Sequence, residues 1–399
     1  MAQERKFSAS VRRPPPGIPR VAVLVDTSTT WGRRIHTGIH NYDRRYGPWQ
    51  LFVEARGVEE AMRVPSDWRG DGIIARVGNV TVAQKLKALR IPVVNVSAIQ
   101  VPGVSFPRVT MDLASSAKLA VEHFLERGFR HFAYFSLLGL TYVSAHQQAF
   151  AEAVGKAGGD FATYTAQPVV GAEPDWNLDL NRLGRWLKAL PRPVGVLTWN
   201  PSSAREIIYA CQQAQLLVPE EVAVLSTGDD DLLCELLQVP VSGILVPAEQ
   251  IGYQAAELLA RLMRGESPPD EPVLLAPQGV KTRQSTDALA VSDPALVKAL
   301  SFIRENAMRS IQVTEVARHA GVSRRLLERR FVHGLGCTPA HEIRRAHMQR
   351  ANSLLGQTDM PISDVAEASG FGSPEHFARL FHQQTGKTPL RYRREVRRP

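Results

Sequence analysis

The chain has 399 residues, of which 44% are hydrophobic and 22% are charged, and its formal net charge is +9. This length has room for two or three domains with a sizeable core. Only Cys211, Cys234 and Cys337 are present, without a Cys-x-x-Cys pair, which argues against a disulfide scaffold and a zinc cluster. No run of 18 apolar residues and no apolar signal segment occur. These features predict a cytoplasmic protein with no metal, no cofactor and no membrane partner.

The first 19 residues differ in composition from the rest of the chain. The first 20 residues hold five basic side chains against one acidic, and residues 12–17 read Arg-Arg-Pro-Pro-Pro-Gly. A segment with so few apolar side chains cannot offset the entropy cost of folding. We therefore predict a disordered basic tail over residues 1–19, with a role on DNA as the alternative.

Residues 20–280 alternate between short apolar runs and helical stretches. Short apolar strands that are followed by helices indicate a parallel sheet covered on both faces. About nine strands exceed one comfortable sheet, so we predict an α/β domain of two doubly wound lobes, with a ligand in the cleft beyond the carboxyl ends of the strands. Residues 281–291 would then form a linker. Strands are predicted at 21–25, 51–54, 72–75, 92–96, 132–135, 195–198, 222–225, 242–246 and 273–276, and helices include 115–127, 203–216 and 252–264.

Residues 292–399 contain two copies of one short pattern. Each copy has a Val-Ala pair, a glycine turn, a phenylalanine and a final Gly-x-Thr-Pro. The offset is 49 residues between Gly321 and Gly370 and 50 between Phe331 and Phe381, so one extra residue enters the second turn. A helix, a tight turn and a second helix form a helix-turn-helix unit. An all-α domain with two such units is predicted.

The first copy has the side chains that such a unit needs. Apolar residues at 313, 316, 317 and 320 would form one stripe on a short helix. Gly321 can end that helix in a left-handed conformation, and Ser323 can cap the next helix. That next helix would bury Leu327 and Phe331. It would expose Arg324, Arg325, Glu328 and Arg329.

The second copy has a stronger helix start. Ser373 is the predicted cap, Pro374 the first helical residue, and Glu375 lies in the first turn. Phe377, Leu380 and Phe381 would form the buried face, and Glu375, His376, Arg379 and Gln383 would remain free for a partner.

A helical bundle with solvated charges is the alternative interpretation of these helices. Charge favours DNA binding, because residues 289–399 carry 18 Lys and Arg against 10 Asp and Glu, a net of +8. Positive charge concentrated on one domain is what phosphate neutralisation requires. A helical stretch at 339–355 is long enough to hold the two units at a fixed separation. The two matching copies therefore predict double-stranded DNA as a partner.

Residues 293–398 resemble the AraC/XylS family of transcription regulators, whose DNA-binding domain has two helix-turn-helix units joined by one long helix. The resemblance rests on Ser-Arg-Arg-x-Leu-x-Arg-x-Phe at 323–331 and on Gly-Phe at 370–371 with Phe377 and Phe381. It implies contacts to base edges from the exposed residues of both second helices. These are Arg325, Glu328 and Arg329 in the first recognition helix and Glu375, His376 and Arg379 in the second.

Two chemical pairings support these assignments. An arginine can bind O6 and N7 of guanine with two parallel hydrogen bonds, and a glutamate can accept from N4 of cytosine. The first recognition helix could therefore read a step that contains a G·C pair. For the other exposed arginines we expect phosphate contact or plain solvation, namely Arg324, Arg330, Arg344 and Arg345.

The order of elements in residues 20–280 resembles the sugar-sensing domain of LacI/GalR repressors, which is built like a type I periplasmic binding protein. The xylose-operon regulators join this domain to an AraC-type domain in the same order, and the resemblance to them spans about residues 20–398. It implies a transcription regulator, not an enzyme, whose DNA binding is gated by a small molecule, a sugar such as xylose. The matching motifs are Trp-Gly-Arg at 31–33, Trp-Arg-Gly-Asp-Gly-Ile-Ile-Ala-Arg at 68–76, Glu-His-Phe-Leu-Glu-Arg-Gly-Phe-Arg-His at 122–131, Val-Pro-Glu-Glu-Val-Ala-Val-Leu at 218–225 and Thr-Arg-Gln-Ser-Thr-Asp at 282–287.

The predicted pocket departs from this family at three places. The family usually has Gly-Val-Asp-Asn after the strand at 222–225, with the aspartate facing the sugar, whereas this chain has Ser-Thr-Gly-Asp at 226–229. Asn-Pro at 200–201 replaces Asn-Asp, and His-Gln at 146–147 replaces an arginine pair. Each buried polar group left unpaired costs about 1–3 kcal/mol. A regulator that answers to a different metabolite, or to no ligand, is therefore the alternative.

Several polar and aromatic residues remain candidates for effector contact. Sugar sites combine polar groups that bond to hydroxyls with an aromatic face for the ring. Ordinary roles are the alternatives, such as packing for the tryptophan, a surface pair for the arginine and turn formation for the asparagine. The candidates are Ser28, Trp31, Arg33, His146, Asn200 and Asp229.

Ligand-gated DNA binding is the expected mechanism. A ligand between two lobes shifts an open–closed equilibrium only by its differential affinity for the two states. A homodimer would bring four recognition helices to one operator on the nucleoid, with each monomer spanning major-groove faces about 10 bp apart. An enzyme is disfavoured because no nucleophile–base motif or phosphate loop occurs. A solute-binding protein for uptake would need an export signal and no DNA-binding domain.

Overall fold

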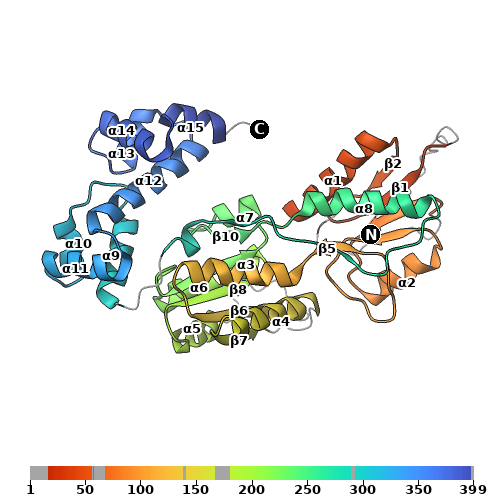
Figure 1. The fold of residues 1–399 in the computed structure, drawn as a ribbon, viewed down its shortest axis with the longest axis horizontal. Helices are drawn as coiled ribbons and strands as arrows, with labels where there is room; N and C mark the ends of the chain where they lie inside the picture. Colours follow the sequence, from red (N-terminus) through yellow and green to blue (C-terminus); the bar gives the residue numbers. More distant parts are fainter. Residues whose placement is uncertain are drawn as a thin grey trace, which may run out of the picture.

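The computed structural model describes residues 17–55, 57, 68–137, 141–166, 180–288 and 293–396. Three bodies follow one another in Figure 1: lobe 1 (residues 17–112 and 247–275), lobe 2 (residues 113–246 and 276–288) and a helical reader (residues 293–396). Residues 1–16 of the predicted disordered tail lie outside the described residues. The chain crosses between the lobes several times, so each lobe is assembled from separate segments.

Lobe 1 is built on a four-stranded parallel sheet in the order β2-β1-β3-β4, with the parallel pair β5-β11 beside it. Its strands are continuous apolar runs because helices cover both faces. Gly38 and Gly252 let α1 and α8 approach until a Cβ at either position would meet the backbone of the other helix. The elements are β1 (Arg20–Leu24), α1 (Thr30–Tyr46), β2 (Gln50–Val53), β3 (Gly72–Ala75), α2 (Val80–Ala88), β4 (Val93–Asn95), β5 (Val109–Met111), α8 (Ala248–Met263) and β11 (Val273–Leu275).

Lobe 2 contains a six-stranded sheet in the order β12-β10-β9-β8-β6-β7. All neighbours are parallel except β12, which pairs with β10 in the antiparallel direction. The inner strands β8, β9 and β10 are buried on both faces, and Phe124, Phe132 and Phe150 fill one side of the sheet. The elements are α3 (Leu113–Glu126), β6 (His131–Leu137), α4 (Thr141–Lys156), β7 (Asp160–Ala166), α5 (Leu180–Ala189), β8 (Val194–Thr198), α6 (Pro201–Ala214), β9 (Val222–Thr227), α7 (Asp231–Glu235), β10 (Ser242–Ile244), β12 (Val280–Lys281) and the 3-10 turn η1 (Gln284–Thr286).

The reader consists of two small helical clusters joined by one long helix, as predicted. Phe331 is fully buried in the first cluster and Phe381 in the second. The long helix α12 contributes Ala346 to the first core and Ala351 to the second, which fixes their separation. The elements are α9 (Pro294–Glu305), α10 (Val313–His319), α11 (Arg324–Leu335), α12 (Pro339–Gln357), α13 (Ile362–Ala368), α14 (Pro374–Thr385) and α15 (Pro389–Val396).

The predicted two-lobed fold is confirmed, and strands form at every predicted run, but three further strands were missed. β7 is an edge strand with a partly exposed pattern, and β5 and β12 have only three and two residues. The region predicted as the start of the linker is bonded into lobe 2, because Lys281 ends β12 and Ser285 and Thr286 are buried. Residues 289–292 of that predicted linker lie outside the described residues.

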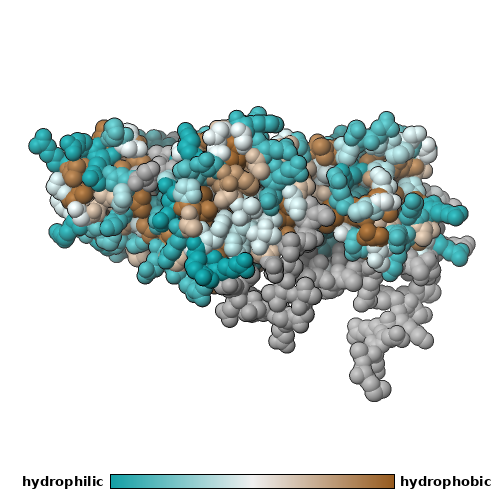
Figure 2. Space-filling view, turned by 90° about the horizontal axis from the view of Figure 1, so that it is seen from below, coloured by the Kyte–Doolittle hydropathy of each residue, from teal (hydrophilic) through white to brown (hydrophobic). Residues whose placement is uncertain are grey.

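The surface is mixed in character. Figure 2 shows hydrophilic side chains over both ends of the visible face, with apolar side chains in smaller areas between them. Among the described helices, none combines the length and apolarity needed to cross a bilayer.

Candidate DNA interface and effector site

The first helix-turn-helix unit has the predicted turn and cap. Gly321 adopts a φ of +71°, a left-handed conformation that favours glycine. The Ser323 hydroxyl accepts a hydrogen bond from the Leu326 amide at 3.2 Å and so caps α11. Leu327 and Phe331 are fully buried. The buried face of α11 is thereby fixed, and its opposite face must point outward.

The outward face of α11 carries the three residues predicted to contact bases. Arg325 and Arg329 are exposed, whereas Glu328 is half-buried. Glu328 accepts a hydrogen bond from Arg324 Nε at 2.9 Å, and the Arg324 and Glu328 side chains are 62% and 43% exposed. Such a surface pair contributes at most about 1 kcal/mol. The carboxylate can therefore exchange this partner for a base without a large loss.

The second unit repeats this arrangement with a longer turn. Ser373 Oγ accepts from the His376 amide at 3.1 Å, and Pro374 is the first residue of α14. Phe377 and Phe381 are fully buried. Glu375, His376 and Arg379 are exposed, and Arg379 Nη2 lies 3.1 Å from Nδ1 of His376.

Besides Arg324, which pairs with Glu328, two of the four arginines expected to be solvated or to contact phosphate have carboxylate partners in the protein. Arg330 is ion-paired with Asp293 at 2.8 Å. Arg345 is paired with Glu342 at 2.6 Å and with Asp287 at 3.0 Å. Burial acts to lower the pKa of Arg345, but the two carboxylates outweigh it and raise that pKa. These two side chains therefore hold the reader together and attach it to lobe 2. Arg344 is exposed, as expected.

The reader also contacts lobe 2 through a buried ion pair. Arg304 on α9 lies 2.5 Å from Glu220, whose side chain is 2% exposed. Burial raises the pKa of Glu220, and the guanidinium opposes that shift. Breaking a buried pair by removing one partner costs about 3–5 kcal/mol, because an uncompensated charge stays behind. The sensor and the first unit are thus bonded across their junction.

One cluster near this junction has donor atoms suited to a metal. Cys337, His341 and Glu342 place one potential ligand atom each within 4.8 Å of one another. Both carboxylate oxygens of Glu342 already accept hydrogen bonds from Arg345, at 2.6–3.1 Å. The positive guanidinium opposes a cation at the same carboxylate, so the cluster is better described as part of the reader's attachment.

The effector candidates of lobe 1 lie in the loop after β1 and the first turn of α1. Trp31 is half-buried, with the Arg76 guanidinium 5.4 Å from its ring centre. Arg76 is ion-paired at 3.2 Å with the fully buried Asp26. Arg33 donates to the Ser28 carbonyl at 2.7 Å, so its guanidinium shapes this loop. Ser28 itself is exposed.

The candidates of lobe 2 have more internal partners. His146 is fully buried, and burial lowers its pKa to about 3, so the ring is neutral. Its Nδ1 lies 2.9 Å from the Tyr134 hydroxyl. The Asn200 side chain accepts from the Ser203 amide at 2.8 Å and caps α6. Asp229 is buried and ion-paired with Arg283 at 2.6 Å.

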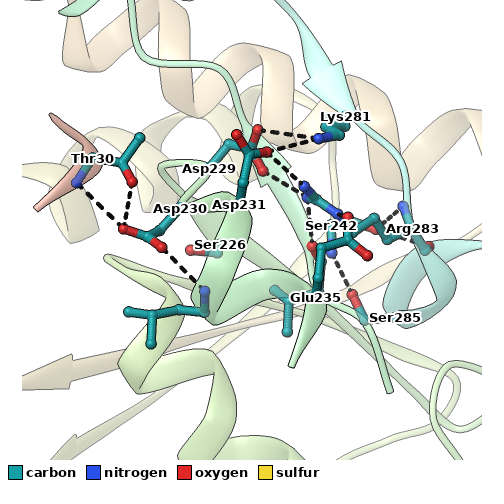
Figure 3. A network of polar contacts seen from close by, with 12 residues as sticks. Thr30, Ser226, Asp229, Asp230, Asp231, Glu235, Ser242, Lys281, Arg283 and Ser285 are labelled. Carbon is teal, nitrogen blue, oxygen red and sulfur yellow. Dashed lines mark hydrogen bonds and ion pairs between the residues drawn. The ribbon is translucent and has the colours of Figure 1, made fainter. Parts of the chain in front are cut away.

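The two lobes meet at the carboxyl ends of β1 and β9. Thr30, the first residue of α1, donates its hydroxyl to Asp230 at 2.8 Å (Figure 3). The same carboxylate accepts from the Leu233 amide at 3.1 Å and caps α7. Although burial disfavours its charge, these hydrogen bonds lower the pKa of Asp230. A charged aspartate thus joins the lobes.

Sequence reasoning missed several polar residues at this junction. Two of them, Asp26 and Arg76, directly follow predicted strands, and Asp230 lies in the loop after the predicted strand at 222–225. Their position after the carboxyl end of a strand was the available signal. Arg283 gave no such signal, because its partners Asp229 and Glu235 lie about 50 residues earlier in the chain.

Family models match three segments of the chain. A XylR N-terminal domain matches residues 20–115, a periplasmic binding protein-like domain matches residues 121–286 and a helix-turn-helix domain matches residues 316–395. The Xylose operon regulatory protein of Escherichia coli strain K12 is 30% identical over 381 residues, which cover 94% of this chain and 96% of that protein. The chain belongs to the family of xylose operon regulatory proteins.

Other relatives agree with this assignment. The Xylose operon regulatory protein of Haemophilus influenzae is 28% identical and covers 94% of this chain and 98% of its own length. The solved structure of the xylose-binding transcription activator xylR aligns with a TM-score of 0.80 and 28% identity, over 95% of this chain and 99% of that one. A LacI family transcriptional regulator from Arthrobacter sp. FB24 shares the fold of the sensor alone, with a TM-score of 0.52 and 20% identity over 67% of this chain and 98% of its own.

Membership in this family confirms the predicted role. The chain is a DNA-binding transcription regulator in which a two-lobed sensor for a small molecule gates a reader with two helix-turn-helix units.

Proposed function

We propose that this chain controls transcription as a homodimer that binds D-xylose, or a closely related pentose, between its lobes. The observation that supports this most is the combination of two exposed, arginine-bearing recognition helices with a two-lobed sensor, in a chain 30% identical to a xylose operon regulator over 94% of its length. Sugar binding would change the relative position of the lobes and thereby the affinity of the reader for DNA.

We assign base contacts to the outward faces of α11 and α14. Arg325 and Arg329 are exposed and have the fork geometry that guanine accepts, and Glu328 can receive a hydrogen bond from cytosine. In α14 the corresponding residues are Glu375, His376 and Arg379. Because α12 fixes the distance between the units, one monomer would contact two successive turns of the major groove.

We assign direct sugar contact to Ser28, Trp31 and Arg33 in lobe 1 and to Asn200 in lobe 2. His146 and Asp229 are held by Tyr134 and Arg283, so these two side chains would position the loops around the sugar. Asp26 and Arg76 extend the lobe 1 site, since Arg76 lies over Trp31 and one of its nitrogens is 3.2 Å from Asp26.

A different metabolite is the second candidate, and a specific observation favours it. Gly228 stands where the family usually has a sugar-facing aspartate, and its φ of +100° opposes a substitution that would restore one. The neighbouring Asp229 points its charge at Arg283. A buried sugar hydroxyl left without a partner would lose about 1–3 kcal/mol of binding.

A thermal-shift screen separates these two candidates. A ligand at 100 times its dissociation constant adds about 2.7 kcal/mol to the free energy of unfolding. The panel is D-xylose, other pentoses and phosphorylated sugars. Stabilisation by D-xylose that is lost in Trp31→Leu, and kept in Tyr46→Leu at the exposed far end of α1, supports the xylose site. Stabilisation by a phosphorylated sugar instead would support the second candidate.

The homodimer is tested separately. Light scattering of the full chain should give twice the mass of one chain, with and without an operator fragment. A monomer on DNA would contradict this part of the proposal.

A further inference from the structure

Residues 281–287, the first part of the predicted linker, are bonded to the rest of the protein at both ends. We propose that residues 281–287, here called the strap, report the relative position of the two lobes to the first helix-turn-helix unit. This inference rests on the proposed function, because a reader that no ligand gates would need no such connection. Figure 3 shows the strap beside the aspartates that follow β9.

The first end of the strap is attached to the place where the lobes meet. The Asp231 carboxylate is ion-paired with two strap residues, Lys281 at 2.8 Å and Arg283 at 3.5 Å. It is also ion-paired with Arg34 of lobe 1 at 3.5 Å. The hydrogen bond from Lys281 is the main cause that lowers the pKa of Asp231. Next to it, Asp230 accepts from Thr30 of lobe 1. A change in the angle between the lobes must therefore alter the contacts of these two aspartates.

The middle of the strap is rigid. The Arg283 side chain is only 6% exposed and lies 2.6 Å from Asp229 and 2.5 Å from Glu235. The backbone amide of Arg283 donates to the Ser242 hydroxyl at 2.8 Å, and that hydroxyl donates to the backbone carbonyl of Arg283 at 2.9 Å. Removing one member of a buried ion pair is costly, so this part cannot absorb a displacement by local rearrangement.

Buried hydroxyls continue this rigid part toward the reader. Ser285 donates to the Val224 carbonyl of β9 at 2.5 Å. The Thr286 hydroxyl donates to the Ser242 hydroxyl at 2.7 Å. Nε2 of His123 is hydrogen-bonded to the same Thr286 oxygen at 2.8 Å. Burial, with Arg127 nearby, lowers the pKa of His123 to about 3, which keeps the ring neutral. A shift of β9 is thus passed to the next residue, Asp287.

The second end of the strap is attached to the reader. The Asp287 carboxylate contacts Arg345 at 3.0 Å and the Gln349 amide, both on α12. Its carbonyl accepts from Arg304 of α9 at 3.3 Å. A cavity of about 420 Å³ lies beside these contacts, lined on the sensor side by Arg127 and on the reader side by Leu335.

The energies of these contacts suit a switch. The end pairs are partly exposed, with side-chain exposures of 38% and 57% for Arg34 and Asp231 and of 32% and 29% for Arg345 and Asp287. Partly exposed pairs are weak and can be exchanged without unfolding. The buried ion pairs of Arg283 in the middle of the strap are stronger and would stay intact when the end pairs exchange. Weak ends joined by a rigid middle transmit a displacement, which distinguishes the strap from a flexible linker.

Hydrogen exchange of the full chain tests the strap without any ligand. Thr30→Val removes the hydroxyl hydrogen bond from lobe 1 to Asp230 and leaves the longer one from the Thr30 amide at 3.4 Å. We expect exchange to rise about twofold to tenfold in residues 281–287 and in α9 and α12, the range for loss of one hydrogen bond. Thr37→Val is the matched control, because Thr37 bonds only to the Arg33 carbonyl within α1. Asp287→Asn, at the other end, should raise exchange in α12 and so calibrate the readout. If Thr30→Val unfolds lobe 1, Arg34→Gln replaces it.

The two proposals fail in different ways. An increase confined to α1 and α7 in Thr30→Val, beside a clear change in α12 for Asp287→Asn, would overturn the strap. Absence of any stabilisation of the wild-type protein by D-xylose would count against the proposed effector and leave the exchange comparison intact. If both proposals hold, Asp287→Asn keeps the thermal shift with D-xylose but binds DNA with an affinity that D-xylose no longer changes.

Discussion

The two helix-turn-helix units have the same backbone design but different attachments. The first unit is bonded to lobe 2 through Arg304 with Glu220 and through Arg345 with Asp287. Among the described residues, no ion pair or side-chain hydrogen bond links α13 or α14 to either lobe. In the proposed mechanism, the sensor acts directly on the first unit, and α12 carries the change to the second.

The recognition helices also differ in charge. The outward face of α11 carries Arg324, Arg325 and Arg329 with one glutamate, whereas that of α14 carries Arg379 with Glu375. Phosphate attraction and its salt dependence should therefore come mainly from the first unit. We therefore expect the first unit to be both the regulated and the more strongly attracted part, with the second unit adding a sequence contact at a fixed distance.

The largest effect is expected when the attachment of the first unit is broken. Arg304→Met leaves Glu220 buried without a partner, so we expect the free energy of unfolding to fall by about 3–5 kcal/mol. Urea unfolding measures this. Arg309→Met is the control, because Arg309 forms an exposed pair with Glu315 and should cost less than about 1 kcal/mol. Equal losses in the two variants would contradict the assigned importance of the buried pair.

The turns of the two units should respond differently to the same substitution. An alanine at Gly321 meets open space, so only the left-handed conformation opposes it, at about 1–2 kcal/mol. At Gly370 a Cβ would lie 2.6 Å from the Arg309 carbonyl and 2.7 Å from Nε2 of His347, and these two groups bond to each other. Gly370→Ala should therefore cost about 1–3 kcal/mol more than Gly321→Ala. Thermal unfolding of both variants checks the order.

The recognition arginines should each contribute to specific DNA binding. Arg329→Ala and Arg379→Ala should each weaken operator binding by about 1–3 kcal/mol and relax the preference at one base pair. Lys298→Ala is the control, since Lys298 is an exposed cation of α9 and belongs to neither recognition helix. Fluorescence titrations with operator variants would show the change. Unaltered affinity and preference in both arginine variants would rule out these contact assignments.

The smallest effects are expected from the helix caps. Ser323→Ala and Ser373→Ala each remove one hydrogen bond to an amide at the start of a recognition helix, at a cost of about 1 kcal/mol. Because the two caps are in separate cores, the costs should add in the double variant. A double variant no less stable than either single variant would mean that one of the two caps does not contribute to stability.

The reader was predictable from the sequence almost to single side chains. Its signals are local: Gly321 precedes Ser323 by two residues, and Phe331 follows eight residues later. The strands of the sensor were predictable for the same reason, except for the short or half-exposed β5, β7 and β12.

The contacts that join the three bodies were not predictable in the same way. Thr30 and Asp230 are 200 residues apart, and Arg345 and Asp287 are 58 apart. Pairs at such separations depend on how whole domains pack, and periodicity or capping patterns carry no information about them. For this reason the ion pair of Asp229 with Arg283 was not predicted, and effector contact by Asp229 stays a prediction.

The most direct test of the account is the affinity of the full-length protein for its operator, measured with and without saturating D-xylose. Gating by a sugar through the sensor predicts that the dissociation constant changes about 5- to 150-fold, the usual range of coupling between two sites. The change should disappear in Trp31→Leu and remain in Tyr46→Leu. A dissociation constant that D-xylose leaves unchanged, while D-xylose still stabilises the sensor, would contradict the coupling between sensor and reader.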